Sequence, residues 1–174
     1  ADGTFIAGTH KLSPQMDYSS IIEILQEEVK DPRETADVVF PEGITLVEAA
    51  ARLEEKGVCN AEEFIEIFNS EKFGFDFEEK VKISALKFYK MEGYLFPDTY
   101  QFYVNMDVDL VCQKILRNFN SKITERDYQR MNELGITLDE TIILASIIQC
   151  EAGSLDQMSR ISSVFWNRMN NSET

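Results

Sequence analysis

Residues 38–70 read VVFPEGITLVEAAARLEEKGVCNAEEFIEIFNS and contain the signals of one strand and two helices. The β-branched and aromatic run 38–40 favours a strand, and residues 41–43, Pro-Glu-Gly, favour a tight turn after it. Thr45 and Glu48 then match a capping box, in which each side chain bonds a backbone N–H group of the other residue. The pattern predicts that a helix begins directly after the turn.

The first helix is expected to end at Gly57, because a residue without Cβ readily takes the left-handed conformation that follows many helices. Asn60 can cap a second helix through its side-chain oxygen. Both helices have an apolar face with helical spacing, formed by Leu46, Ala49, Ala50, Leu53 and by Phe64, Ile67, Phe68. Residues 38–70 therefore predict a strand–helix–helix module.

Shorter signals flank this module. Upstream, residues 5–12 are strand-like, and Asp17 is placed to cap a helix that contains Ile21, Ile22 and Leu25. Downstream, Gly93 and Pro97 prevent a continuous helix, and residues 100–104 alternate like a half-buried strand. Because strands and helices are mixed without a regular alternation, we predict an α+β fold.

Strongly patterned helices follow toward the end of the chain. Thr137 and Glu140 form a second capping box before the run 142–148, which is apolar on nearly every side and is therefore expected in the core. Ser154 and Gln157 match a further box, which opens a helix with Ile161, Phe165 and Met169 on one face. Weaker patterns predict helices around residues 110–119 and 128–134.

The composition excludes several classes of function. The chain carries 31 acidic and 17 basic side chains, a net charge of −14, whereas a protein that binds duplex nucleic acid needs a basic surface. Its three cysteines are widely spaced and its single histidine is His10, so neither a CxxC site nor a multi-histidine metal site is expected. We predict no bound metal, and cysteines that act as small buried hydrophobic side chains.

Glu151 is the acidic side chain that fits its sequence surroundings least. It follows Leu144 by two helical turns and Ile148 by one, so a helix places its carboxyl on the same face as these apolar side chains. Partial burial there, together with the negative end of the helix dipole, favours the protonated carboxyl that a general acid at a glycosidic oxygen requires. The alternative from spacing alone is a surface glutamate that ends a helix before Gly153.

Three motifs occur in an order and spacing that resemble a known family. They are Glu92-Gly93-Tyr94-Leu95-Phe96-Pro97-Asp98-Thr99-Tyr100, Leu144-Ala145-Ser146-Ile147-Ile148-Gln149-Cys150-Glu151 and Val164-Phe165-Trp166-Asn167-Arg168-Met169. Over nearly its whole length the chain thereby resembles the YceG-like (MltG) endolytic murein transglycosylases. The resemblance implies enzymes that cut peptidoglycan glycan strands between N-acetylmuramic acid and N-acetylglucosamine without water, leaving a 1,6-anhydro end.

The resemblance gives one glutamate a catalytic role. The family's catalytic glutamate matches Glu151, and because the preceding acidic position of the motif is Gln149 here, Glu151 alone carries the acid and then the base role. Candidate residues of the substrate cleft, or of the contacts that support it, are Tyr94, Asp98, Tyr100, Asn167 and Arg168. For these five, the alternative is a role in maintaining the fold.

The resemblance also implies a division of the chain. Residues 1–34 match the end of a first LysM-like part, residues 35–70 a LysM-like strand–helix–helix module, residues 71–91 a connecting segment, and residues 92–174 the N-terminal portion of a mainly helical catalytic domain. Family members are attached to the cell membrane by one N-terminal span and face the cell wall. No apolar run here approaches the roughly 20 residues that span a bilayer, so we expect this chain to lack the anchor. The resemblance also implies further segments beyond Met169, so we expect the C-terminal part of the catalytic domain to be missing as well.

The implied partners are peptidoglycan glycan strands, the cell-wall synthesis machinery and, through the anchor, the membrane. Two alternatives stay open: a non-catalytic, glycan-binding LysM-like module, and an activity lost because both ends are missing. A pyridoxal-phosphate lyase would need a Schiff-base lysine with a phosphate-binding loop, and no glycine-rich loop adjoins a lysine. We therefore expect no cofactor.

Overall fold

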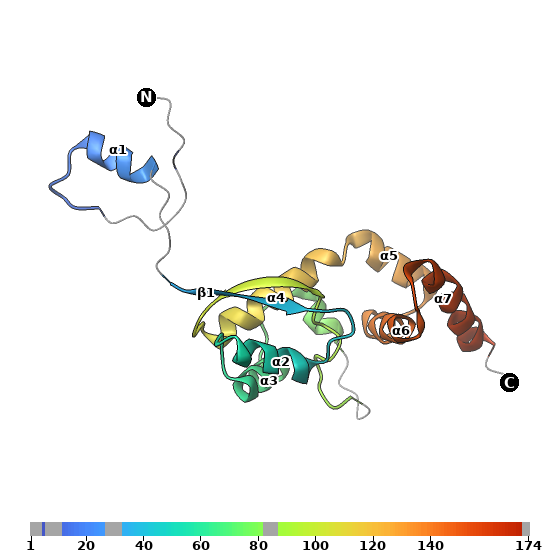
Figure 1. The fold of residues 1–174 in the computed structure, drawn as a ribbon. Coiled ribbons are helices and arrows are strands. Elements are labelled where there is room, and N and C mark those ends of the chain that lie inside the picture. The colour runs from blue at the N-terminus through green and yellow to red at the C-terminus, as the bar shows by residue number, and fades with distance from the viewer. Residues whose placement is uncertain (1–4, 6–11, 27–32, 82–86, 172–174) are drawn as a thin grey trace. The chain divides into compact units, whose positions relative to one another are not determined.

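The computed structural model describes residue 5 and residues 12–26, 33–81 and 87–171. Its elements are helices and a small antiparallel sheet, which confirms the predicted α+β class. In chain order they are α1 (Tyr18–Gln26), β1 (Thr35–Phe40), α2 (Leu46–Glu55), α3 (Ala61–Ser70), the 3-10 helix η1 (Asp76–Lys80), β2 (Asp98–Tyr103), α4 (Val108–Lys122), α5 (Glu125–Leu134), α6 (Leu138–Glu151) and α7 (Leu155–Asn170) (Figure 1).

The chain divides into two compact units, of which the first, residues 1–34, contains α1. Asp17 caps this helix as predicted, because its Oδ1 accepts a hydrogen bond of 2.8 Å from the Ser20 N–H. The same bond lowers the pKa of the Asp17 carboxyl. The predicted strand at residues 5–12 falls almost entirely outside the described residues.

The second unit, residues 35–174, is built on the antiparallel pair β1 and β2. Val38 pairs with Tyr100, and the alternation of side chains gives the sheet two different faces. The inner face is buried and consists of Val38, Phe40, Tyr100 and Phe102, whereas Val39 on the outer face is 51% exposed. Both strands were expected from the sequence, and both are confirmed.

Helices α2 and α3 follow the predicted capping pattern. Thr45 Oγ1 accepts a hydrogen bond of 3.2 Å from the Glu48 N–H, and Glu48 Oε2 accepts one of 3.0 Å from the Thr45 N–H. Gly57 takes a φ of +68° after α2, and the side chain of Asn60 caps α3. The sequence therefore predicted the start and the end of α2 and the start of α3 correctly.

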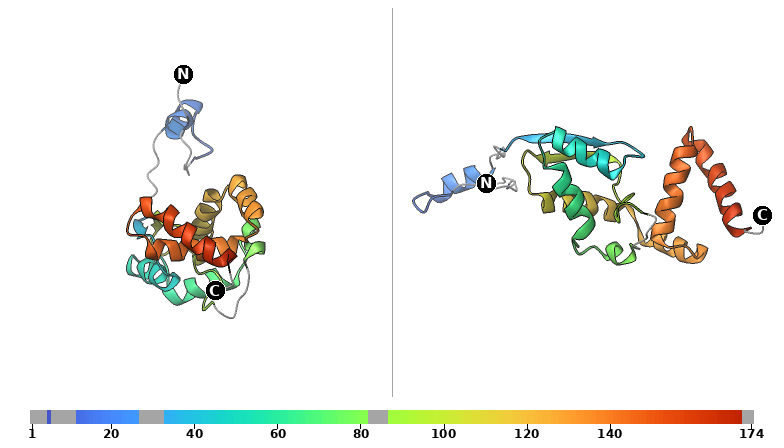
Figure 2. Two further views of the ribbon diagram at one scale, coloured as in Figure 1. Left: turned by 90° about the vertical axis from the view of Figure 1, so that its right-hand side faces the viewer. Right: turned by 90° about the horizontal axis from the view of Figure 1, so that it is seen from below.

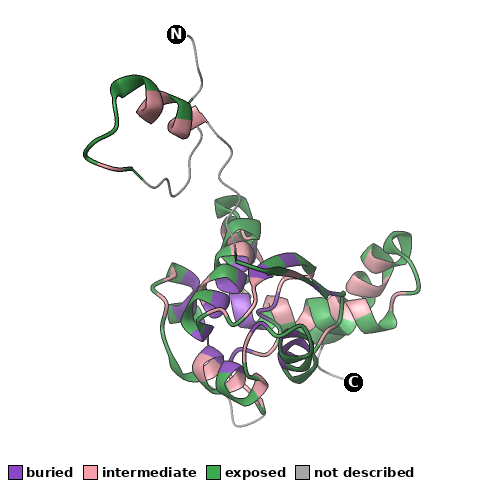
Figure 3. Cartoon of the chain, turned by 60° about the vertical axis from the view of Figure 1, so that its left-hand side comes forward, coloured by how far each residue is buried: buried purple, intermediate pink, exposed green. Residues whose placement is uncertain are grey.

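The main hydrophobic core lies between the inner face of the sheet and helices α2, α3 and α4, where buried segments gather in Figure 3. The helices contribute Leu46, Ala49, Ala50, Leu53, Phe64, Phe68, Val111, Cys112, Ile115, Leu116 and Phe119. Of the cysteines, Cys112 is buried, Cys59 is half-buried and Cys150 is exposed. The prediction of buried cysteines is therefore right for Cys112 and wrong for Cys150, whose helix is only partly covered.

Helices α6 and α7 form a hairpin at one end of this unit (Figure 2). The expectation that residues 142–148 belong to the core is wrong: α6 is buried only at Leu138 and Asp139, while Ile143 and Ile147 are 43% and 39% exposed. A helix that is apolar all round is fully covered only when neighbours surround it. α6 packs against α7, α5 and η1, which leave part of its circumference open.

The start of α7 also differs from the prediction. The helix is present, but the capping box expected at Ser154 is wrong. Gln157 Oε1 instead accepts a hydrogen bond of 3.3 Å from the Gly153 N–H. The second predicted box, Thr137 with Glu140 at the start of α6, is confirmed.

One glycine brings the segment before β2 into contact with α6. Gly93 has a φ of +87°, a conformation that side chains with a Cβ rarely adopt. A Cβ placed there would lie 2.7 Å from Ile142 Cγ2, which is closer than two carbon atoms can approach. Gly93 is therefore required both by its own backbone and by its neighbour on α6.

We expect Gly93→Ala to destabilise the protein more than Gly135→Ala. Gly135 has a φ of +69° but open space around it, so its substitution introduces only backbone strain of about 1–2 kcal/mol. Gly93→Ala adds a clash with a stiff β-branched side chain, for about 1–3 kcal/mol more. Urea unfolding at equilibrium measures both changes.

A compensating variant separates the two effects. Ile142→Leu removes the clashing Cγ2 methyl, so in the Gly93→Ala background it should recover part of the lost stability. Equal losses for Gly93→Ala and Gly135→Ala, or no recovery by Ile142→Leu, would contradict the close approach.

Candidate active site

Glu151 is the last residue of α6 and its side chain is exposed. The sequence correctly placed it on the helical face of Leu144 and Ile148. The partial burial expected for it is not observed, because α6 is open to solvent around its last turn. The Glu151 side chain is therefore accessible to solvent.

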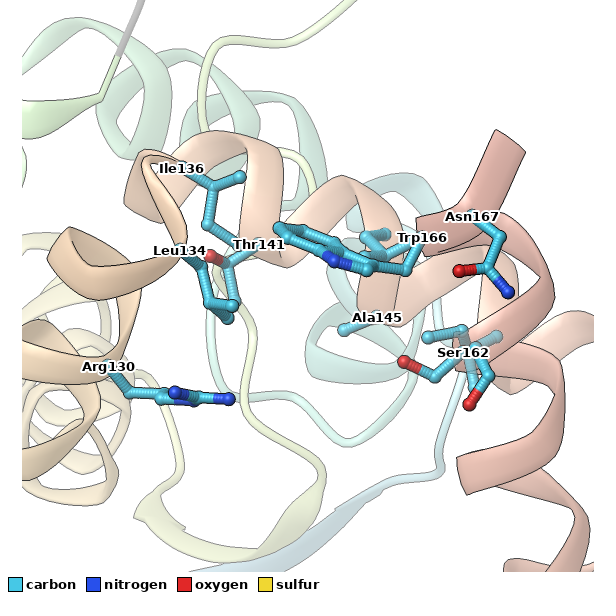
Figure 4. A pocket seen from close by; sticks show the side chains of 11 residues that line it. Arg130, Leu134, Ile136, Thr141, Ala145, Ser162, Trp166 and Asn167 are labelled. Atoms are coloured by element: carbon cyan, nitrogen blue, oxygen red, sulfur yellow. The ribbon is translucent and has the colours of Figure 1, made fainter. Parts of the chain in front are cut away.

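A cavity of about 470 Å³ lies beside the same face of α6, between this helix, the end of α5 and α7 (Figure 4). Thr141, Leu144, Ala145 and Ile148 line it from α6. These residues form one helical stripe, and Glu151 extends that stripe two turns, about 10 Å, beyond Leu144. Glu151 itself does not line the cavity; it lies one helical turn beyond Ile148, the last α6 residue that does.

The other walls combine apolar surface with polar groups. Trp166 extends its indole from α7 toward Thr141, and Arg130 approaches from α5 (Figure 4). The guanidinium of Arg130 forms an exposed ion pair of 2.7 Å with Glu133. Trp166 and Arg130 were not predicted as site residues: Trp166 stood inside a quoted motif, whereas the sequence around Arg130 gave no signal.

The two candidates on α7 occupy different positions. Asn167 lines the cavity together with Ser162 and Ser163. Arg168 is exposed and does not belong to the cavity wall. Asn167 is therefore the one of the five further candidates that the fold brings to the same cavity as the α6 stripe.

Tyr94 and Tyr100 are core residues. Tyr94 is completely buried, and burial together with the hydrogen bond to Asp139 raises the pKa of its hydroxyl. Tyr100 is 4% exposed, packs its ring 5.1 Å from that of Phe40, and donates a hydrogen bond of 2.7 Å to the Phe96 carbonyl. Burial also raises the pKa of Tyr100. Neither ring is available to stack on a sugar.

Asp98 is exposed at the start of β2, where its carboxylate is held by local donors. Its Oδ1 accepts a hydrogen bond of 2.8 Å from the Thr99 N–H, and its Oδ2 accepts one of 3.1 Å from the Asn118 side-chain amide. These bonds, with Lys122 at 3.9 Å, lower the pKa of Asp98. The Asn118 amide also donates a hydrogen bond of 2.8 Å to the hydroxyl of Tyr100, so this cluster connects β2 to α4.

The predicted site residues thus separate into two groups. Glu151, Asn167 and Arg168 lie on the α6–α7 hairpin, whereas Tyr94, Asp98 and Tyr100 belong to the core and to the start of β2. Within the described ranges, no three His, Cys, Asp or Glu side chains are grouped as metal ligands would be. None of the helices in those ranges combines the length and hydropathy needed to span a bilayer.

The model of the YceG-like family matches residues 1–174. The chain belongs to the YceG-like family. Among solved structures, a YceG-like protein from Listeria monocytogenes has a similar fold, with a TM-score of 0.67, 23% identity, and coverage of 96% of this chain and 57% of that chain.

Two related proteins carry a functional name. An endolytic murein transglycosylase of Streptococcus pneumoniae serotype 2 is 26% identical over 181 residues, which cover 94% of this YceG-like chain and 32% of that protein. One of Bacillus subtilis is 25% identical over 173 residues, covering 95% of this chain and 47% of that protein. The chain therefore spans between about a third and about half of the length of these relatives.

We expect one of the three thiols to react much faster than the others with a disulfide reagent. Cys150 is exposed in the last turn of α6. Burial, with Glu63 and Glu54 nearby, raises the pKa of Cys59 to about 11, and burial also raises the pKa of Cys112. The absorbance of the thiolate that the reagent releases, followed at mildly alkaline pH, should show that one thiol per chain reacts quickly. The other two thiols should react once the protein is unfolded.

Cys150→Ser is the control and should abolish the fast equivalent alone. A fast phase that survives in this variant would contradict the exposure of the last turn of α6.

We also expect Asp98→Asn to destabilise the protein in a pH-dependent way. The folded pKa of Asp98 lies below its unfolded value, so its contribution is present above the unfolded pKa and is lost as the pH falls through the folded one. The gap in urea midpoint between parent and variant should therefore shrink below about pH 4. Asp156→Asn, an exposed carboxylate at the start of α7, should show a small gap throughout. A gap for Asp98→Asn that stays constant into acid would refute this role.

Proposed function

We propose that this chain carries the catalytic glutamate of an endolytic murein transglycosylase, and that Glu151 is that residue. The proposal is supported by membership of the YceG-like family and by the names of the Streptococcus pneumoniae and Bacillus subtilis relatives. The observation that carries it is the position of Glu151 one turn beyond the α6 residues that line the cavity, with an exposed side chain.

The proposed reaction needs one group that first donates and then accepts a proton. The Glu151 carboxyl protonates the oxygen between N-acetylmuramic acid and N-acetylglucosamine as the bond from C1 to that oxygen breaks. The resulting carboxylate removes the proton from the C6 hydroxyl of the muramic acid residue. The C6 oxygen then bonds to C1 and closes the 1,6-anhydro ring, so water is not consumed and the glutamate returns to its acid form.

A single carboxyl is sufficient because the nucleophile belongs to the substrate. Glycosidases that use water or an enzyme nucleophile place two carboxyl groups around the bond. Here the C6 hydroxyl is tethered to the reacting sugar, and tethering replaces the positioning of a second reactant. A bound strand would cover the exposed carboxyl and withdraw water from it, which favours the neutral acid needed for the first step.

The remaining candidates receive unequal support. Asn167 lines the cavity beside the α6 stripe, and its amide can donate to and accept from the polar substituents of a sugar. Arg168 is exposed on α7, where its cation can meet an anionic part of the substrate. For Tyr94, Asp98 and Tyr100, the burial and local hydrogen bonds support a role in the fold instead.

The cellular setting belongs to the same proposal. A transglycosylase that acts on murein works on the outer side of the cell membrane, and we propose that the full-length protein is anchored there. Residues 35–70 are proposed as its LysM-like module and residues 92–174 as the first portion of its catalytic domain.

We expect Glu151→Gln to lower the release of anhydro-ended muropeptides by about 10²–10⁴-fold, because glutamine can neither donate nor accept the proton at neutral pH. The measurement is mass spectrometry of products from purified murein sacculi treated with the full-length protein. Asp156→Asn is the matched control, since it removes an exposed carboxylate at the start of the adjacent helix, and it should keep full activity.

Undiminished anhydro product from Glu151→Gln would exclude this glutamate as the acid. Equal binding of sacculi by all forms, without any anhydro product, would favour the non-catalytic glycan-binding alternative.

A further inference from the structure

A buried polar cluster joins the start of α6 to the core of the second unit. Asp139 lies in the first turn of α6 and is 5% exposed. Its Oδ1 accepts a hydrogen bond of 3.0 Å from the hydroxyl of Tyr94 and forms an ion pair of 2.5 Å with Lys87 Nζ. Both donors come from the segment between η1 and β2, so the cluster connects two parts of the chain that are distant in sequence.

The Tyr94 side of this cluster is held firmly. Its ring lies 5.8 Å from that of Phe77 at an interplanar angle of 11°, and 5.2 Å from that of Phe119 at 58°. Lys87 Nζ lies 5.5 Å from the centre of the Tyr94 ring. Because these aromatic neighbours belong to the core, the hydroxyl presents a fixed donor to α6.

A second contact on the same face of α6 restricts how the helix can turn. Ile142 follows Asp139 by one helical turn, and its Cγ2 fits against the backbone of Gly93, where a Cβ would be 2.7 Å away. Beyond this first part, α6 has partly or fully exposed side chains up to Glu151. The direction of the helix is therefore set mainly near its beginning.

Because α6 is long, a small change in direction at its first turn displaces the residues of its last turn. Glu151 follows Asp139 by twelve residues, or about 18 Å of helix at 1.5 Å per residue. A rotation of about 5° at the first turn thus moves the Glu151 carboxyl by about 1.5 Å. A misplacement of about 1 Å in an enzyme site can lower a rate by about 10²-fold.

We propose that Tyr94, Asp139 and Lys87 form an anchor that fixes the direction of α6 and thereby positions Glu151. The inference rests on the proposed function of Glu151. The three residues are positioning residues: they act through the helix and touch neither substrate nor reacting atoms. A buried charged pair is weak evidence for stability, but its directional hydrogen bonds select one arrangement over others.

The direct test measures the helix itself and needs no catalysis. Cys150 in the last turn of α6 is exposed and accepts a nitroxide label, and Glu55→Cys at the end of α2 provides a second exposed site. Pulsed electron paramagnetic resonance then gives the distribution of distances between the labels. Tyr94→Phe, which removes only the hydroxyl, should broaden or shift this distribution by about 1–2 Å or more.

The control is a core substitution of similar severity on another helix. Phe64 is completely buried in α3, with its ring 5.1 Å from that of Phe68. Phe64→Leu should lower the unfolding midpoint and leave the label distances unchanged. Lys87→Arg keeps the cation and should retain most of the narrow distribution, whereas Lys87→Met should lose it.

The catalytic test uses the full-length protein on murein glycan. Tyr94→Phe and Asp139→Asn should each lower kcat by about 10–10²-fold with little change in KM, because they leave the binding surface intact. The double variant should lose little more than the more severe single variant, since the two residues act as one unit. Phe64→Leu should retain the parent kcat per folded molecule.

The outcomes separate this inference from the proposed function. An unchanged distance distribution in Tyr94→Phe overturns the anchor, whatever Glu151 does. A broadened distribution with an unchanged kcat overturns the link between anchor and Glu151. Full activity of Glu151→Gln would instead remove the proposed function, while the distance measurement would still report on the helix.

Discussion

The antiparallel pairing of β1 with β2 is the constraint on which the second unit depends. It brings residues 35–40 against residues 98–103, across the helices α2 and α3 that lie between them in sequence. Closing so long a loop costs conformational entropy, which is offset by burying the inner face of the sheet on these helices and on α4. The pairing of Val38 with Tyr100 shows the result, since both side chains lie in the core.

The same segment that leads into β2 also reaches the candidate site. Gly93 allows close approach to α6, and Tyr94 carries a hydrogen bond from the aromatic core to Asp139. A segment that builds the core thus orients the helix that ends at Glu151. This explains why Tyr94 can matter for the proposed chemistry while lying far inside the protein.

Helices α6 and α7 show how a hydrophobic pattern and its surroundings can disagree. α6 has the composition of a core helix, yet its neighbours cover only part of it, and a cavity with both apolar and polar walls remains beside it. The exposure of Glu151 is part of the same arrangement. Under the proposed function, this exposure leaves the carboxyl open to an approaching glycan strand.

Local structure could be read from the amino-acid sequence: the α+β class, the caps at Thr45, Asn60 and Thr137, and the helical face shared by Leu144 and Glu151. These follow from interactions within a few residues, which the order of amino acids specifies directly. Which side chains are buried could not be read in this way, because burial depends on neighbours that are distant in sequence. The fold buries Tyr94 and Tyr100 in the core, leaves the last turn of α6 exposed to solvent, and brings Trp166 and Arg130 to one cavity.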